Sequence, residues 1–251
     1  MPNFQLEWDK TGEHFYETGV DHGVLYPQVK AQNGTVSYPK GHAWNGLTGV
    51  SESPSGGDPN NIYADNMKYL VLRGTEDFGA TVTCYTYPDA WMDCDGSSTF
   101  ADGGVIIGQQ ARKPFGLAYR TRIGSDANGD SEGYKLHLIY NATSSPSEKA
   151  YSTVNESPEA IEFSYEITTT PVAIAGEEYK DYRPISVITI DSRKFKETAA
   201  AARLTALEQT LYGTAAVEAA SEGETGTPAV DAYLPDPATV INMLKAPAND
   251  G

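Results

Sequence analysis

The stretch "FGLAYRTRIG", residues 115–124, decides how the chain is interpreted. Its side chains alternate in character, which is typical of a β-strand with two unlike faces. It also carries two arginines in a protein with 34 Asp and Glu against 18 Lys and Arg, a net charge of −16. Residues 104–124 contain no acidic residue and four basic ones, namely Arg112, Lys113, Arg120 and Arg122.

A second strand is expected at residues 134–140, joined to the first by a turn centred on Asn128-Gly129. This pairing places the large apolar residues of both strands on one face of the hairpin. The opposite face then holds four cationic side chains: Arg120, Arg122, Lys135 and His137. Like charges across a strand pair cost roughly 0.2–1 kcal/mol, so this face requires carboxylates.

Two sources of carboxylates are open. In "EAIEFSYEI", residues 159–167, Glu162 and Glu166 point away from the apolar side chains of their strand and could lie beside the hairpin. A neighbouring copy of the same acidic chain is the other source. The first reading makes the cationic face internal, and the second makes it a subunit interface.

The rest of the chain reads as a mainly β protein. Its 251 residues suit one large all-β domain or two small ones, and 16 Tyr and 24 Gly favour strands and turns over helices. One long helix is expected at residues 197–212, with a leucine stripe and Gly213 after its end. Expected strands lie at residues 24–28, 81–87, 115–123, 134–140, 160–168 and 185–190.

The domain organisation follows from these patterns. Residues 1–213 are expected to form the β domain, 214–232 an acidic flexible segment, and 233–251 a C-terminal segment with a short helix capped by Asp236. Residues 42–64 are rich in Gly, Ser, Pro and Asn, which predicts a functional loop or a disordered one.

Composition excludes several classes of function. A charge of −16 opposes non-specific DNA binding, and no apolar run is long enough to cross a bilayer. The first ten residues lack a secretion signal, so synthesis in the cytoplasm is expected. Cys84 and Cys94 are then expected as reduced buried thiols, a disulfide being the alternative. "DANGDSEG", residues 126–133, departs from a calcium loop and is expected at a hairpin tip.

No catalytic motif is found, and we expect no enzyme activity, no cofactor and no metal. The aromatic residues Trp44, Trp91 and Tyr87 could stack on sugars if exposed, which supports a carbohydrate-binding β-sandwich as an alternative function. Aromatic side chains are more commonly buried or placed at interfaces.

Three long runs carry a family resemblance: residues 63–91 ("YADNMKYLVLRG…"), 104–126 ("GVIIGQQARKPFGLAYRTRIGSD") and 133–172 ("GYKLHLIYNATSS…"). They resemble the major tail protein, or tail tube protein, of phages with long non-contractile tails that infect Gram-positive bacteria. The resemblance implies a sandwich or partly closed barrel of two packed antiparallel sheets, with one flanking helix and a long loop that reaches a neighbouring ring.

The same resemblance implies a structural role in the virion tail. Hexameric rings would stack around the tape measure protein, between tail terminator and distal tail proteins, and viral DNA would pass through the acidic lumen without specific binding. A distal tail or tail terminator protein is the alternative within the tail. Candidate subunit-interface residues are Trp44, Asn45, Pro54, Asp58, Asn60, Arg112, Lys113, Arg120, Arg122, Lys135, Glu162 and Glu166.

Overall fold

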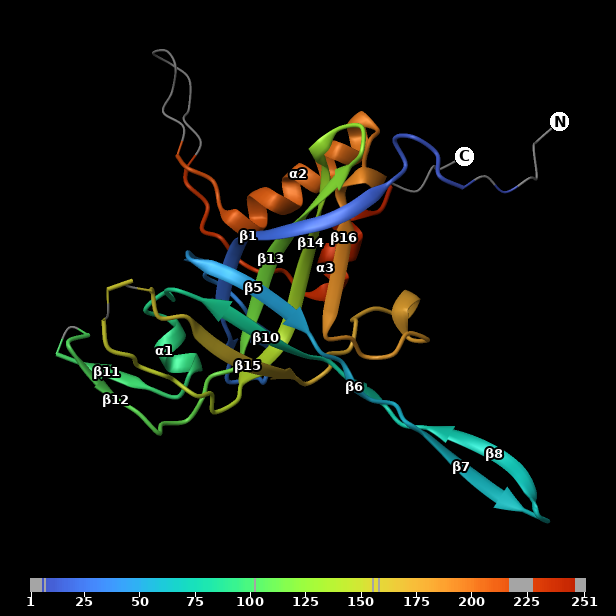
Figure 1. Ribbon diagram of the computed structural model, residues 1–251, viewed down its shortest axis with the longest axis horizontal. Helices are drawn as coiled ribbons and strands as arrows, with labels where there is room; N and C mark the ends of the chain where they lie inside the picture. Colours follow the sequence, from blue (N-terminus) through green and yellow to red (C-terminus); the bar gives the residue numbers. More distant parts are fainter. Residues whose placement is uncertain are drawn as a thin grey trace.

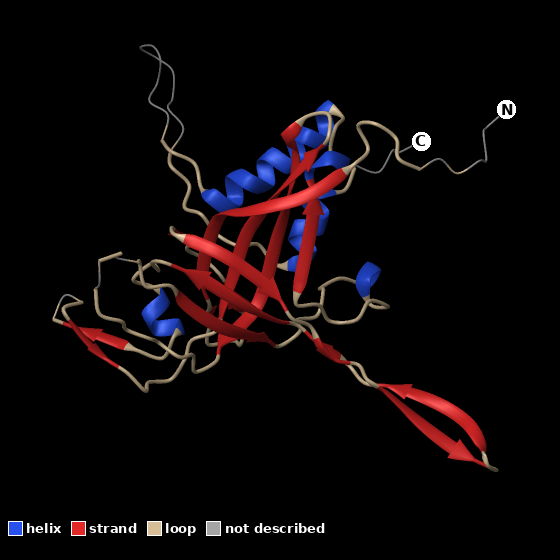
Figure 2. Cartoon of the chain, in the orientation of Figure 1, coloured by secondary structure: helices blue, strands red, loops and turns tan. Residues whose placement is uncertain are grey.

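The computed structural model describes residues 6, 8–101, 103–154, 156–157, 159–216 and 228–246. Antiparallel strands are its main regular structure, and the helices lie at its periphery (Figure 2). The prediction of a mainly β, sandwich-like fold with a flanking helix is therefore confirmed.

The strands are β1 (Phe15–Pro27), β2 (Val29–Lys30), β3 (Val36–Ser37), β4 (His42–Trp44), β5 (Leu47–Glu52), β6 (Ser55–Gly56), β7 (Pro59–Ala64), β8 (Met67–Arg73), β9 (Glu76–Asp77), β10 (Gly79–Cys84), β11 (Ser98–Phe100), β12 (Val105–Ile107), β13 (Phe115–Ser125), β14 (Gly129–Ser144), β15 (Phe163–Thr169) and β16 (Val187–Asp191). The helices are α1 (Trp91–Cys94), α2 (Thr198–Tyr212) and α3 (Pro237–Leu244), with short 3-10 turns at Glu177–Tyr179 and Ser192–Lys194.

Eight strands form one continuous sheet in the order β4-β1-β13-β14-β15-β10-β5, with β16 also paired to β14. The long strand β14 pairs with β13 and β16, and its last residues, 142–144, pair with β15. It thereby joins a front half (β4, β1, β13, β14, β16) to a back half (β15, β10, β5) that crosses it (Figure 1). The two layers of the expected sandwich are thus parts of one sheet, which does not close into a barrel.

The first hydrophobic core lies between the two halves. The front half contributes Leu25 and Leu117, the back half contributes Val82 and Tyr165, and Trp91 of α1 closes the space, all of them buried. Burial of a large apolar side chain stabilises the fold by about 1.5–3 kcal/mol. This core therefore fixes the back half over the front half.

The second core lies on the other face of the front half. Leucines 204, 207 and 211 of α2 form the stripe that the sequence predicted, and they pack on Leu136 and Leu138 of β14. The helix ends at Gly213, whose φ of 76° suits glycine. In α3 the predicted cap is present, because Asp236 accepts a hydrogen bond from the backbone N–H of Thr239 at 3.1 Å. Most of the segment predicted to be acidic and flexible, residues 217–227, lies outside the described residues.

The hairpin of β13 and β14 differs from the prediction by one residue in register. Tyr119 pairs with His137 and Arg120 with Leu136, so Arg120 and Lys135 point to opposite faces of the sheet. The predicted single face of four cations is wrong. Both faces of this hairpin are buried, and a β-bulge between Ile123 and Ser125 shifts the pairing near the turn. The stretch 126–133 does lie at the hairpin tip, as expected.

Residues 42–64 are not a disordered loop. Their first part forms β4 and β5 of the sheet, and the rest forms β6 and β7, which pair with β9 and β8. Asp65 and Asn66 have φ values of 52° and 63°, as in a tight two-residue hairpin turn. Residues 55–77 thus form a two-stranded arm that projects from the body (Figure 1).

Cys84 and Cys94 are separate buried thiols, as predicted. Burial raises the pKa of Cys84 and raises that of Cys94 to about 12, so the reactive thiolate is scarce at neutral pH. We expect a thiol reagent at pH 8 to leave the native protein almost unlabelled and to modify two thiols per chain in guanidinium without reductant. Rapid labelling of the native protein, or fewer than two thiols after denaturation, would contradict this assignment.

Candidate assembly surfaces

The arm exposes apolar side chains to solvent. Its register places Ile62 opposite Leu70 and Leu72 opposite Asn60, so the three apolar residues share one face of the ribbon. Tyr63 and Tyr69 near the tip are about two-thirds exposed, at 67% and 66%. Within the described chain, β7 and β8 pair only with each other. A two-stranded ribbon is marginally stable alone in water, and clustered exposed apolar groups mark interaction sites.

Four of the predicted interface residues are exposed, and three of them belong to the arm or its base. Pro54 and Asp58 lie at the base and Asn60 lies on β7, whereas Asn45 lies in the turn before β5, at the end of that strand away from the arm. Trp44 was wrongly placed among them. It is 3% exposed, its ring packs 4.7 Å from that of Trp91, and its indole N–H donates to the carbonyl oxygen of Thr86.

The arginines of β13 find their carboxylate within the chain. Arg120 donates from Nε to Asp21 Oδ1 at 2.7 Å and from Nη2 to Oδ2 at 3.2 Å, and Arg122 Nε donates to Oδ2 at 3.0 Å. Burial by itself raises the pKa of Asp21, but these hydrogen bonds outweigh it and hold the pKa well below its usual value. Asp21 lies on β1, directly across from Arg120.

The basic residues on the other face also have carboxylate neighbours within the chain. Lys135 bonds to Glu17 of β1, and His137 Nδ1 lies 3.3 Å from Glu52 of β5. Burial lowers the pKa of His137 although Glu52 opposes it, and the ring stacks on that of Tyr119 at 4.6 Å. The partners of the hairpin cations are therefore residues that the sequence analysis did not name. Of the two carboxylate sources left open, Glu162 and Glu166 are not these partners.

Replacing Asp21 by Asn should destabilise the monomer by about 1–3 kcal/mol, because it removes charged hydrogen bonds and leaves Arg120, 20% exposed, without its partner. Arg122→Gln is the matched control and should cost under about 1 kcal/mol, since its side chain is 55% exposed. The folded pKa of Asp21 is depressed, so its contribution is complete above about pH 4 and disappears as the pH falls further. Chemical denaturation at pH 7 and pH 3 measures this, and equal losses at both would contradict it.

Glu162 and Glu166 belong to the outer surface of the back half. Glu162 accepts a hydrogen bond from Thr48, and Glu166 pairs in register with Thr81. We call this surface the hydroxyl face, formed by Thr48, Ser51, Thr81, Thr83, Glu162, Ser164, Glu166 and Thr168. None of the strands β5, β10 and β15 contains Lys or Arg. The face is hydroxyl-rich and acidic.

The two remaining cations lie away from the hairpin face. Lys113 Nζ bonds to Asp93 of α1 at 2.5 Å, and the half-buried Arg112 lies beside a shallow hollow with Ser97 and Lys149. Lys149 in turn bonds to Asp95 at 2.5 Å. These contacts tie the segment that precedes β13 to α1.

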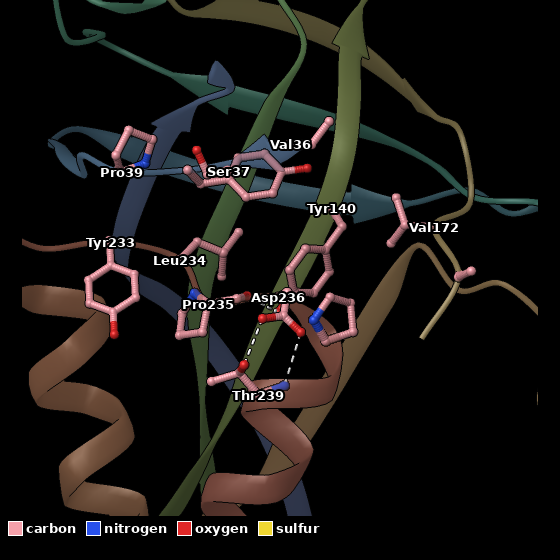
Figure 3. A pocket seen from close by; sticks show the side chains of 13 residues that line it. Val36, Ser37, Pro39, Tyr140, Val172, Tyr233, Leu234, Pro235, Asp236 and Thr239 are labelled. Carbon is pink, nitrogen blue, oxygen red and sulfur yellow. Dashed lines mark hydrogen bonds between the residues drawn. The ribbon is translucent and has the colours of Figure 1, made fainter. Parts of the chain in front are cut away.

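A groove between β3, β14 and α3 offers no catalytic constellation (Figure 3). The hydroxyl of Tyr140 donates to the carbonyl oxygen of Pro235 at 3.0 Å, and burial raises its pKa. The carboxylate of Asp236 is held by the backbone N–H and the hydroxyl of Thr239, at 3.1 and 2.6 Å. The other lining residues are mainly apolar or aromatic.

Sequence reasoning missed the apolar residues of the arm and those of the β11–β12 ribbon, which include Phe100 and Val105. The pair Asp65-Asn66 between two runs of strand-forming residues was the available signal for the arm. Among the described residues, no cluster of three or more His, Cys, Asp or Glu could hold a metal ion. No helix in the described segments has the length and apolar character needed to span a membrane.

No protein-family model matches the sequence, and no curated protein matches it significantly.

Proposed function

We propose that this protein is the structural subunit of a phage tail tube. Copies of the chain form hexameric rings, and the rings stack around the tape measure protein into a conduit for viral DNA, between distal tail and tail terminator proteins. The proposal places the chain in the virion tail and gives it no catalytic role. The observation that carries it is the arm, a projecting ribbon whose exposed apolar face has no partner among the described residues.

The arm supports self-assembly for a physical reason. Exposed, unpaired strands are an aggregation hazard, and a soluble protein retains them when a partner covers them. The outer part of the arm, residues 59–73, carries Lys68 and Arg73 against Asp65, a net charge of +1, whereas the whole arm, residues 55–77, has a net charge of −2. The outer part of the arm can therefore approach another acidic copy without adding charge repulsion.

The hydroxyl face supports the role of a DNA conduit. A wall that contains Lys or Arg would bind phosphates and retain DNA, whereas hydroxyl and carboxylate groups do not. We therefore assign the outer surface of β5, β10 and β15 to the lumen. The double change Glu162→Lys and Glu166→Lys should leave folding intact, because Glu166 is exposed and Glu162 makes only a surface hydrogen bond.

Assembled tubes of this double variant should retain DNA in a salt-dependent manner, and wild-type tubes should not. Electrophoretic mobility of DNA mixed with tubes at low and high salt measures the difference. Glu177→Lys with Asp181→Lys, at exposed positions outside the hydroxyl face, is the matched control for net charge. Equal DNA retention by the control would contradict the assignment of the hydroxyl face to the lumen.

Sedimentation and negative-stain microscopy of the purified protein over a range of concentrations test the proposed function. Monomers or small species should convert to tubes of uniform width as concentration rises. Single rings that never stack would favour a distal tail or tail terminator protein instead. A protein that stays monomeric at high concentration, with tape measure protein also present, would refute the proposal.

A further inference from the structure

The β11–β12 ribbon, residues 98–100 and 105–107, is a second two-stranded element that remains unpaired within the described chain. Phe100 pairs with Val105 and Ser98 with Ile107, so the three apolar side chains share one face of the ribbon. Phe100, Val105 and Ile107 are 57%, 50% and 45% exposed. The ribbon thus presents a small apolar face with no cover from the described part of its own chain.

The arm presents a face of matching kind. Ile62, Leu70 and Leu72 form a row of three apolar side chains that are 37%, 36% and 53% exposed. Each ribbon is marginally stable alone, and two ribbons packed face to face at about 10 Å would bury both rows. Each face has three apolar side chains and neither ribbon pairs with another strand among the described residues.

The contact must join two copies. The arm and the β11–β12 ribbon lie at opposite ends of the long axis of the molecule, with the body between them (Figures 1 and 2). An arm therefore cannot reach the ribbon of its own chain. Because the two surfaces differ, a contact between them is heterologous, leaves one free surface of each kind, and can repeat from copy to copy.

Charge also favours this pairing. The outer part of the arm, residues 59–73, has a net charge of +1, and the acidic residues Asp58, Glu76 and Asp77 lie at its base. Residues 85–111, which include the β11–β12 ribbon, contain four Asp and no Lys or Arg. Two of the four, Asp93 and Asp95, bond to Lys113 and Lys149. The weakly cationic outer part of one arm would thus meet an acidic segment of the next copy.

We propose that the Ile62, Leu70 and Leu72 face of the arm packs on the Phe100, Val105 and Ile107 face of the β11–β12 ribbon of a second copy of this chain. The inference rests on the proposed function and deepens it, because it names the surface that receives the arm. In each junction, the arm of one copy is here called the donor, and the β11–β12 ribbon of the next copy is called the acceptor. The same junction repeats from copy to copy.

Two full-length variants test the pairing. Leu70→Asp with Leu72→Asp damages the donor, and Val105→Asp with Ile107→Asp damages the acceptor. Asn61→Asp and Thr99→Asp, on the opposite faces of the two ribbons, are the matched controls. Both ribbons lie outside the two cores, so melting temperatures should stay close to wild type. Sedimentation velocity should show each damaged variant stopping at a smaller species, and both controls assembling like wild type.

Mixing the two damaged variants provides the decisive measurement. The variant with a damaged arm keeps an intact β11–β12 ribbon, and the variant with a damaged ribbon keeps an intact arm. One junction can therefore form between the two variants, and the mixture should give a species of twice the mass that either variant forms alone, with no further growth. Wild-type assembly together with normal assembly of the Val105→Asp, Ile107→Asp variant would overturn the inference and leave the proposed function standing. Failure of the mixture to form the joined species would also overturn it. A wild-type protein that never assembles would refute the proposed function, and the inference with it.

Discussion

Removal of the arm should abolish tube formation and leave the body of the protein folded. The change replaces residues 55–77 with two glycines. The flanking strands already approach each other there, because the backbone N–H of Ser53 donates to the carbonyl oxygen of Gly79 at 2.8 Å. The two cores draw no residue from the arm, so the free energy of unfolding should change by less than about 1 kcal/mol.

Assembly should respond much more strongly, since every junction in a tube would lose its donor. Thermal melting measures the first expectation, and sedimentation with negative-stain microscopy measures the second. Asn61→Asp in a full-length arm is the control, because it changes the arm on the face opposite Ile62, Leu70 and Leu72. Normal tubes from the shortened protein would show that the arm is dispensable for assembly and would remove the main support for the proposed function.

Elements whose signal is local were predictable. The leucine stripe of α2, its end at Gly213 and the Asp236 cap of α3 each depend on residues within a few positions of one another. The strands near residues 81–87 and 115–123 could also be recognised from alternation. These features can be recognised without knowing which residues pack against them.

Features that depend on tertiary pairing were not predictable. The register of β13 and β14 was missed because the pattern assumes one buried face, whereas this hairpin packs on a core at each face. Asp21 and Arg120 are far apart in sequence, and β1 carries two irregularities that bring the carboxylate into place. No spacing rule identifies such a pair.

The arm was misread for a compositional reason. Residues 42–64 have the glycine, proline and asparagine content of a loop, and the apolar strand that completes the hairpin, β8, lies beyond that window. Strand β7 lies within that window, and its backbone hydrogen bonds are made with β8 outside it. The candidate interface residues on the exposed part of this segment stay predictions, whereas Trp44 is buried in the sheet.

Burial of Trp44 and Trp91 weakens the carbohydrate-binding alternative, which rested on these two residues and on Tyr87, a half-buried side chain packed on Phe163 and Tyr165. Trp91 is 0% exposed, and its ring lies 4.7 Å from Trp44, 5.1 Å from Phe115 and 5.0 Å from Tyr165. An aromatic side chain that stacks on a sugar must present one ring face to solvent. In this protein the ring faces neighbouring aromatic rings, so its role is to hold α1 and the back half on the front half of the sheet.

Trp91→Ala should therefore destabilise the protein by about 3–5 kcal/mol, the usual cost of removing a large buried aromatic side chain. For a chain of this size, such a loss lowers the melting temperature by roughly 10 °C. Trp91→Phe keeps most of the ring contacts and is the matched control, with a smaller loss. Tyr85→Ala, at a 52% exposed position near the same core, should cost under about 1 kcal/mol. Chemical denaturation and glycan binding are measured on all three variants. A Trp91→Ala protein of wild-type stability that had lost binding to a glycan would contradict the core assignment and restore the carbohydrate-binding alternative.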